Sequence, residues 1–373
     1  MNLTQAELRD IVYNFIVYGD FLVGIPFGGG HVNDTYQLTF DQGGVRLYYI
    51  LQRINHNAFR QPENVMENLD RVTAHLLEKI HAARLETRRR TIRLLRTPAG
   101  KTYTYDRCGN CWRAYVFIAN ARAYDVLETP EQAFRIAQTI GEFQLNLIDL
   151  PGKRLHETIP NFHNTPKRLE ALENSIKADK AGRVKEVSRE IDFIMARREE
   201  CSKLLELHAE GTIPERITHN DTKSNNILID DLSGEGLCMI DLDTVMPGLS
   251  LYDFGDIVRS GTNPAEEDET DLSKVGMRFE MYEALHRGYV DMTSDFLTPA
   301  EYENLPFAGK LITLEIGIRF LADYLDGDIY FKTRRASHNL DRCRTQLKLV
   351  DDMEKNYDEL VSIVSDIMQT VKG

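Results

Sequence analysis

The sequence lacks the features that define several large protein classes. It contains only five cysteines, an odd number that is too small for a disulfide framework. It has no apolar run of about 18 residues, so no membrane-spanning helix is predicted. The first residues show neither the basic segment nor the apolar segment of a secretory signal, and we therefore expect a cytoplasmic protein.

Positive charge is also in deficit. The chain has 45 Lys and Arg against 58 Asp and Glu, a formal net charge of −13. This balance disfavours nucleic acid or a membrane surface as the main partner, and solubility is a sufficient reason for it. Internal repeats and low-complexity segments are absent from the sequence, and nothing in it predicts an oligomeric state.

Two of the cysteines, Cys108 and Cys111, form a C-x-x-C pair. A structural metal site would need a second pair, which the sequence does not contain. A redox motif would need a strand before it and a helix after it, whereas both flanks here are strand-like. The pair therefore indicates a hairpin turn.

The order of elements predicts an α+β protein. Thr4 and Glu7 form a capping box that begins a helix, and strand-like runs follow at 21–26, 32–40 and 45–52. A helix is predicted from about 63 to 85, with an apolar stripe on one face. At 129–132, Thr-Pro-Glu-Gln opens a mostly helical remainder. With 373 residues, two lobes are expected, a small β-rich lobe at 1–120 and a larger helical lobe at 121–373.

The most informative motif runs from His219 through Asp221 to Asn226, in the form H-x-D-x-x-x-x-N. In the catalytic loop of kinases, this Asp accepts a proton from the attacking hydroxyl and this Asn binds a metal ion. A short apolar strand, a turn with glycine and a second apolar strand follow, and then come Asp241 and Asp243. Such a hairpin would return Asp241 to the end that carries Asn226, with Asp241 and Asp243 on one strand face. A surface turn followed by an acidic strand end is the alternative.

Two further features bear on phosphate binding. A run of three glycines begins at Gly28, between two predicted strands, where kinases have a glycine-rich loop over the phosphates of ATP. A plain hairpin turn is the alternative. The third strand lacks the lysine that protein kinases use, and Arg53 is the nearest cation, with Glu67 or Glu63 as its partner. A solvated Arg53 is the alternative there.

These motifs resemble the aminoglycoside phosphotransferase and choline kinase branch of the protein-kinase-like fold. Within that branch, the block at 240–256 closely resembles the N-acetylhexosamine 1-kinases, and the Asp-Thr-Val-Met-Pro-Gly stretch at 243–248 points to this subfamily. The blocks at 30–36, 51–53, 317–321 and 327–331 resemble it as well. The resemblance thus spans most of the chain, and it implies a bilobal fold with a nucleotide-binding N-lobe and a catalytic, sugar-binding C-lobe.

The resemblance also implies ATP and Mg²⁺ as cofactors and transfer of phosphate to the anomeric hydroxyl of GlcNAc or GalNAc. It assigns Asp221 as the base and Asn226 and Asp241 as metal ligands. The residues that it suggests for the sugar are Asp243, Arg319, Tyr330, His31 and Asn33. Those expected near the nucleotide are Gly28, Gly29, Gly30, Arg53, Glu67, Phe117, Ile118, Ala119 and Asn120.

Two other functions stay open at this point. The chain could be another small-molecule kinase of the same family, with choline, homoserine, an aminoglycoside or a different sugar as its substrate. It could also be a nucleotide-binding protein without activity, but all three residues of the predicted catalytic set are present. For Arg319, an i,i+4 pair with Asp323 on one helix is an alternative to sugar binding.

Overall fold

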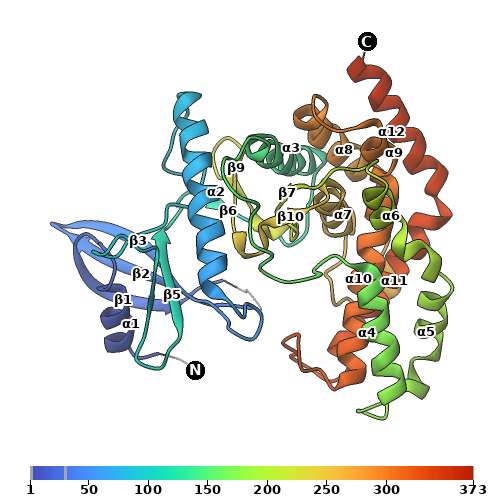
Figure 1. The fold of residues 1–373 in the computed structure, drawn as a ribbon, viewed down its shortest axis with the longest axis horizontal. Coiled ribbons are helices and arrows are strands. Elements are labelled where there is room, and N and C mark those ends of the chain that lie inside the picture. The colour runs from blue at the N-terminus through green and yellow to red at the C-terminus, as the bar shows by residue number, and fades with distance from the viewer. Residues whose placement is uncertain (1–2, 29–31, 373) are drawn as a thin grey trace. The chain divides into compact units, whose positions relative to one another are not determined.

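The computed structural model describes residues 3–28 and 32–372. The chain divides into two compact units (Figure 1). The first unit comprises the chain up to Ala121 together with two later segments, Asp149–Pro160 and Leu237–Met246. The second comprises Arg122–Ile148, Asn161–Gly236 and the chain from Pro247 onward.

An antiparallel sheet forms the body of the first unit, with the strand order β1-β2-β3-β5-β4. The three predicted strands of the first 53 residues are confirmed within one or two residues at most ends. The strands of this sheet are β1 (Asp20–Pro26), β2 (Asp34–Gln42), β3 (Val45–Arg53), β4 (Tyr103–Tyr105) and β5 (Cys111–Val116).

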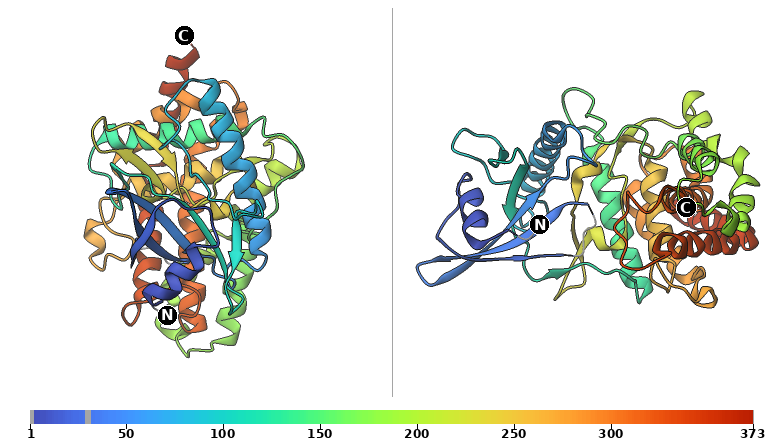
Figure 2. Two further views of the ribbon diagram at one scale, coloured as in Figure 1. Left: turned by 90° about the vertical axis from the view of Figure 1, so that its left-hand side faces the viewer. Right: turned by 90° about the horizontal axis from the view of Figure 1, so that it is seen from below.

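Helix α1 (Gln5–Val12) begins at the predicted capping box, in which Thr4 and Glu7 bond reciprocally. It lies against the sheet (Figure 2). Leu8 and Val12 share a buried cluster with Phe40 and Trp112. Burial of these apolar side chains is the main force that holds the helix on the sheet.

Helix α2 (Pro62–Ala82) starts with proline in its first turn and ends three residues before the predicted end. The predicted apolar stripe is buried, as expected for an amphipathic helix that packs on a sheet. Its members are Val65, Leu69, Val72 and Leu76.

The C-x-x-C pair lies in a hairpin, as predicted. Tyr105 at the end of β4 pairs with Cys111 at the start of β5, and the Trp112 indole donates a hydrogen bond to Asp106 in the turn. The five cysteines are free, and Cys108 is the exposed one. The pair therefore shapes a turn between two strands.

Helices dominate the second unit (Figure 1). Helix α3 begins at the predicted capping box of Thr129 and Gln132. It packs closely on α8, because a Cβ at Gly288 would lie 2.1 Å from the carbonyl oxygen of Phe134. The helices are α3 (Pro130–Leu147), α4 (Thr165–Ala178), α5 (Ser188–Met195), α6 (Lys203–Ala209), α7 (Ser250–Gly261), α8 (Phe279–Thr293), α9 (Pro299–Glu303), α10 (Leu305–Asp326), α11 (His338–Lys355) and α12 (Tyr357–Lys372).

Short strands frame the predicted catalytic region. The two strands expected around the glycine-containing turn form, and the N–H of Asp230 donates to the carbonyl of Glu235 at 2.8 Å to close that turn. Together with the sheet and the helices, they confirm the predicted α+β class. The short strands are β6 (Ala121–Arg122), β7 (Arg216–Thr218), β8 (Ile227–Asp230), β9 (Gly236–Met239) and β10 (Met246–Gly248).

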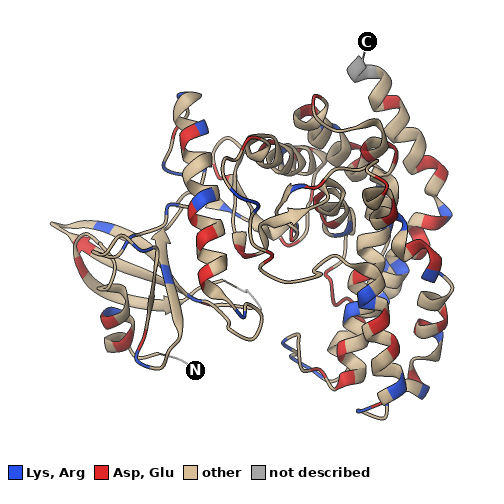
Figure 3. Cartoon of the chain, in the orientation of Figure 1, with Lys and Arg blue, Asp and Glu red and all other residues tan. Residues whose placement is uncertain are grey.

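Acidic and basic residues are interspersed along helices such as α4, α5 and α11 (Figure 3). This mixture fits the view that the net negative charge serves solubility. Within residues 3–28 and 32–372, no helix combines the length and apolar character that crossing a bilayer requires.

Candidate active site

The predicted catalytic loop follows β7 and is anchored by a buried carboxylate of α7. Asp253 accepts hydrogen bonds from the backbone N–H groups of His219 at 3.0 Å and Asn220 at 2.7 Å. Gln144 of α3 donates to the same carboxylate at 2.7 Å. Burial raises the pKa of Asp253, although these donors and the His219 ring oppose the shift. The anchor holds Asn220 in a left-handed conformation, with φ +65°.

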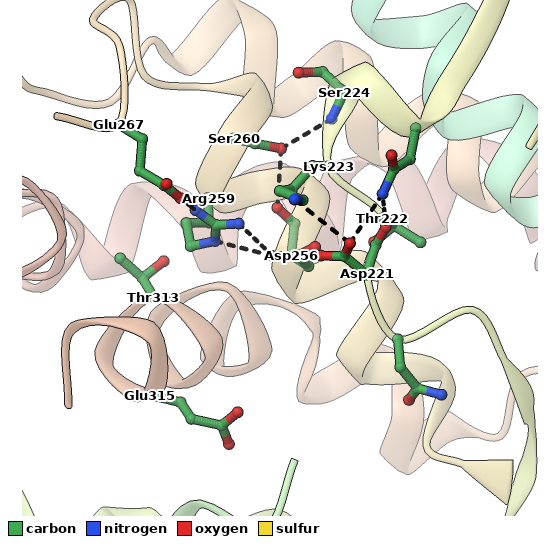
Figure 4. Close-up of polar contacts among 12 residues, drawn as sticks. Asp221, Thr222, Lys223, Ser224, Asp256, Arg259, Ser260, Glu267, Thr313 and Glu315 are labelled. Atoms are coloured by element: carbon green, nitrogen blue, oxygen red, sulfur yellow. Dashed lines mark hydrogen bonds and ion pairs between the residues drawn. The ribbon is translucent and has the colours of Figure 1, made fainter. Parts of the chain in front are cut away.

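Asp221 is the next residue of the loop, and its side chain keeps 28% of its surface exposed. Its Oδ2 lies 3.4 Å from the Lys223 Nζ and accepts a 3.0 Å hydrogen bond from the Asn226 Nδ2 (Figure 4). Burial alone would raise the pKa of Asp221, but the charges of Lys223 and other cations outweigh it and lower the pKa. The carboxylate is therefore ionised at neutral pH and can accept a proton.

Asn226 lies in a short 3₁₀ turn, Ser224–Asn226, and is buried. Its amide nitrogen also donates to the Asp221 carbonyl at 2.8 Å. Because the nitrogen is directed at Asp221, the carbonyl oxygen of the planar amide is directed elsewhere. An amide oxygen is a ligand that hard divalent cations accept.

A second charged group lies beside this loop, on α7. The Arg259 guanidinium donates to Asp256 at 2.9 and 2.8 Å and to Glu267 at 2.8 Å (Figure 4). Ser260 links this group to the loop, because its Oγ donates to the Asp256 carbonyl and accepts from the Ser224 N–H at 3.3 Å. Arg259 is buried, and its charge contributes to the lowered pKa of Asp221.

The sequence analysis missed Lys223, Asp253 and Arg259. Lys223 had a local signal, because it stands two residues after the predicted base. Asp253 lies in the block at 240–256, and Arg259 just after it, but nothing in the sequence links either residue to a loop more than 30 positions earlier.

The first unit contains Asp241 and Asp243, and here the prediction of a shared strand face is wrong. Strand β9 ends at Met239, Asp241 has a left-handed φ of +57°, and Leu242–Thr244 forms a 3₁₀ turn. Asp tolerates the left-handed region better than most residues, so the acidic sequence turns instead of extending the apolar strand.

Asp243 is buried and forms an ion pair with Arg113 of β5. Its other oxygen accepts from the Asn33 Nδ2 at 2.6 Å, and the Asn33 Oδ1 accepts from the Asn55 N–H at 3.0 Å. Arg113 also donates to the Gln52 Oε1 at 2.9 and 2.6 Å. Burial would lower the pKa of Arg113, but the Asp243 carboxylate outweighs burial and raises it. The sequence analysis missed Arg113, whose only signal is its position as the one charged residue in the apolar strand Cys111–Val116.

The expected pair between Arg53 and a glutamate of α2 does not form among the described residues. Arg53 donates instead to Asp34, its neighbour across the β2–β3 pair. Glu67 lies 3.0 Å from the His156 ring, and Glu63 accepts from the Tyr105 hydroxyl. Asp34 is directly opposite Arg53 in the strand register, which makes it the nearest available carboxylate.

The segment predicted for the nucleotide base follows β5. The Phe117 N–H donates to the Tyr48 carbonyl at 3.1 Å, and its ring contacts those of Phe27 and Tyr48 edge-on. Ile118 is buried, whereas Ala119 and Asn120 are exposed. Gly28 has a φ of +76°, a conformation that favours glycine. Gly29, Gly30 and His31 lie outside the described residues.

Arg319 and Tyr330, the candidates near the C-terminus, lie in the second unit. The Arg319 guanidinium stacks over the rings of Phe162 at 5.0 Å and Phe331 at 5.6 Å. The alternative pair with Asp323 is wrong, because Asp323 accepts instead from the N–H groups of residues 329–331. Tyr330 follows α10 and is 55% exposed.

Comparison with known proteins identifies the family. The chain matches the phosphotransferase enzyme family, APH, over residues 23–286. The match covers more than half of the chain, so this protein belongs to that family. It is therefore a phosphotransferase, and the family implies ATP as the phosphoryl donor.

Solved structures support the fold. An aminoglycoside phosphotransferase from Alicyclobacillus acidocaldarius is similar with a TM-score of 0.57 and 13% identity, over 100% of this chain and 97% of that one. An ethanolamine kinase from Plasmodium vivax has a TM-score of 0.53 and 14% identity, over 87% and 82%. A choline kinase from Cryptosporidium parvum has a TM-score of 0.51 and 13% identity, over 92% of each chain. These similarities confirm the predicted kinase-like fold.

Proposed function

We propose that this phosphotransferase is an ATP-dependent small-molecule kinase that phosphorylates the anomeric hydroxyl of N-acetylhexosamines, GlcNAc or GalNAc. The observation that carries the proposal is the partly exposed Asp221 carboxylate, held between Lys223 and Asn226. The sugar class rests on the resemblance of residues 240–256 to the N-acetylhexosamine 1-kinases.

Asp221 acts as the base in this proposal. Its ionised carboxylate accepts a hydrogen bond from the attacking hydroxyl and orients its oxygen. It takes up the proton as the bond to the γ-phosphorus of ATP forms and the bond from that phosphorus to the departing ADP breaks. Lys223 keeps the carboxylate ionised and places a positive charge next to it. Hydrogen bonds anchor the backbone before Asp221 on Asp253 and the backbone after it on Ser260. Positioning of this kind supplies much of the rate in phosphoryl transfer.

The donor set suits Mg²⁺. We propose the Asn226 amide oxygen and the Asp241 carboxylate as ligands, because hard cations prefer oxygen. No cluster of three or more His, Cys, Asp or Glu that could hold a metal occurs in the described part of the chain. Mg²⁺ sites of ATP-using enzymes have few protein ligands, so the two residues fit. A bound Mg²⁺ would neutralise phosphate charge.

The proposal also assigns the residues that would bind the nucleotide and the sugar. We assign the first lobe, residues 1–120, to the nucleotide and residues 121–373 to catalysis and the sugar. Arg53, Glu67, the glycines at 28–30 and the 117–120 segment are the nucleotide candidates. Asp243, Arg319, Tyr330, His31 and Asn33 are the sugar candidates. For Asp243 and Asn33, the bonds to Arg113 and Asn55 favour a positioning role over direct contact.

The second candidate function is kinase activity on a different acceptor. Ethanolamine and choline kinases share the fold, so a small amino alcohol remains an alternative substrate. We further propose a cytoplasmic protein without a nucleic-acid or membrane partner, as expected from its composition.

A substrate panel tests this function. ADP release is measured with ATP, Mg²⁺ and one acceptor at a time: GlcNAc, GalNAc, glucose, choline, ethanolamine, homoserine and an aminoglycoside. The proposal predicts turnover with the two N-acetylhexosamines, its loss in excess EDTA and its return with added Mg²⁺. Turnover with choline or ethanolamine alone would refute the sugar assignment, and full activity in EDTA would refute the metal.

A further inference from the structure

The peptide bond that joins Asn220 to the predicted base Asp221 is held at both of its polar atoms. The Asp221 N–H donates to the His219 Nδ1 at 3.3 Å. The Asn220 carbonyl lies 2.8 Å from the Nε2 of His163, a residue 57 positions earlier in the chain. A carbonyl oxygen can only accept, so the Nε2 of His163 must carry a proton and donate it.

The opposite nitrogen of His163 faces a carboxylate. Its Nδ1 lies 2.9 Å from the Glu315 Oε1 of α10, and the Thr165 hydroxyl donates to the Glu315 Oε2 at 2.6 Å. Both His163 and Glu315 are buried. With acceptors on both ring nitrogens, the ring is satisfied best as a doubly protonated imidazolium. Burial would lower the pKa of His163, but the Glu315 charge outweighs burial and raises it.

Other side chains restrict the same peptide and the same ring. The Asn220 Oδ1 accepts from the Thr218 Oγ at 2.9 Å, and a Cβ at Gly248 would lie 2.7 Å from that Oδ1. The centroid of the His163 ring lies 4.7 Å from that of Phe162 and 4.8 Å from that of Tyr252. The titratable or charged groups around the His163–Glu315 pair are Arg319 of α10, Tyr252 and Asp256 of α7, Arg168 of α4 and Cys201.

We propose that His163, oriented by Glu315, is a positioning residue of the phosphotransferase, and that its Nε2 proton holds the Asn220–Asp221 peptide in the plane that aims the base. Asn220 has a left-handed φ of +65°, a region that Asn tolerates, so the orientation of the following peptide depends on the hydrogen bonds that hold it. Asp253 accepts hydrogen bonds from the N–H groups of His219 and Asn220, just before this peptide. His163 binds the carbonyl oxygen of the peptide itself. The inference rests on the proposed role of Asp221, although not on the identity of the sugar.

The first test is the protonation state of His163 in the intact protein. Nitrogen NMR of ¹⁵N-histidine-labelled protein, with His163→Gln to assign the signal, should show both ring nitrogens protonated at a pH of about 8. That is well above the ordinary histidine pKa of about 6.5. An Nε2 without a proton would overturn the proposal, since no donor would then reach the Asn220 carbonyl. This result depends on neither activity nor substrate.

The second test separates positioning from folding. His163→Leu removes the donor and should lower kcat by about 10–100-fold while the KM for ATP changes little, as expected when a base is misaligned. His163→Gln places an amide N–H three bonds from Cβ, as in Nε2 of histidine, and should restore most of the lost turnover. Turnover of His163→Leu equal to wild type, or of His163→Gln as low as His163→Leu, would overturn the proposal.

His286 supplies the matched control. It is a buried histidine of the same unit, and its two ring nitrogens have no hydrogen-bond partner among the described residues. His286→Leu should therefore leave kcat unchanged. If the wild-type protein releases no ADP with either N-acetylhexosamine, the substrate proposal fails. The NMR result still decides the inference in that case, and turnover is then followed with the acceptor that the panel identifies.

Discussion

At the scale of single residues, the chemistry depends on how the surroundings of Asp221 control its charge. Its carboxylate is partly buried, a situation that would favour the protonated form, yet Lys223 and Arg259 keep it ionised. Although these cations surround the carboxylate, about a quarter of the Asp221 side chain remains exposed. A base must be both ionised and accessible, and Asp221 is both.

Asp221→Asn should lower kcat by about 10²–10⁴-fold, the usual effect of losing a general base. The amide is nearly the same size, so the loop and the nucleotide affinity should change little. Turnover by ADP release and ATP binding by calorimetry measure the two quantities. Near-normal turnover would remove Asp221 from the mechanism, and loss of ATP binding would indicate structural damage instead.

Lys223→Met should shift the acid limb of the kcat–pH profile to higher pH. In the wild type, Lys223 lowers the pKa of Asp221, so activity persists until the pH falls through that depressed value. Without this cation, burial is opposed only by the remaining positive groups, so the pKa of Asp221 rises and the carboxylate becomes protonated at a higher pH. Stopped assays across the acidic range, corrected for stability, follow the limb. An unmoved limb would mean that Lys223 does not control the charge of Asp221.

At the scale of elements, buried charged side chains attach short polar segments to the regular structure. The 3₁₀ turn at Leu242–Thr244 is tied to β5 by the Asp243–Arg113 pair. The catalytic loop is tied to α7 by Asp253. These segments contain left-handed residues and little regular hydrogen bonding, so they depend on the elements around them for their shape.

Arg113→Met should lower the free energy of unfolding by about 3–5 kcal/mol, because it leaves the Asp243 carboxylate buried without its partner. The double variant Arg113→Met with Asp243→Leu should recover part of that loss, since no charge then remains buried. Urea unfolding followed by circular dichroism compares the variants. Arg53→Met is the matched control: its pair with Asp34 is about one-third exposed on each side, so its loss should be about 1 kcal/mol or less. Equal midpoints for Arg113→Met and the wild type would contradict this account.

The sequence could predict interactions between residues that are close along the chain, and it could not predict those between distant ones. The capping boxes at Thr4 and Thr129 and the hairpin at Cys108 depend on neighbours along the chain, and the structure confirms them. Arg113 pairs with Asp243, and Glu315 lies beside His163, although each pair is more than 100 residues apart in the chain, and a single sequence contains no signal for such pairs. The strand expected through Asp241 was wrong because side-chain alternation holds only while a strand continues, and this strand ends at Met239, two residues before Asp241.

At the scale of the whole molecule, the chain is a phosphotransferase of the APH family with a kinase-like α+β fold. Aminoglycoside, ethanolamine and choline phosphotransferases share that fold at 13–14% identity, so the fold does not select the acceptor. The acceptor is therefore determined by the particular residues of this chain, and the identity of the phosphorylated hydroxyl has to be measured directly.

The decisive measurement is the position of the phosphate in the product. GlcNAc or GalNAc is incubated with excess ATP and Mg²⁺, and reducing ends and ADP are quantified in the same samples. Phosphate on C1 prevents ring opening, so the account predicts that one reducing end disappears for each ADP formed. Asp221→Asn protein serves as the control for background hydrolysis of ATP. Sugar-dependent formation of ADP without any loss of reducing ends would place the phosphate on another hydroxyl and contradict the account.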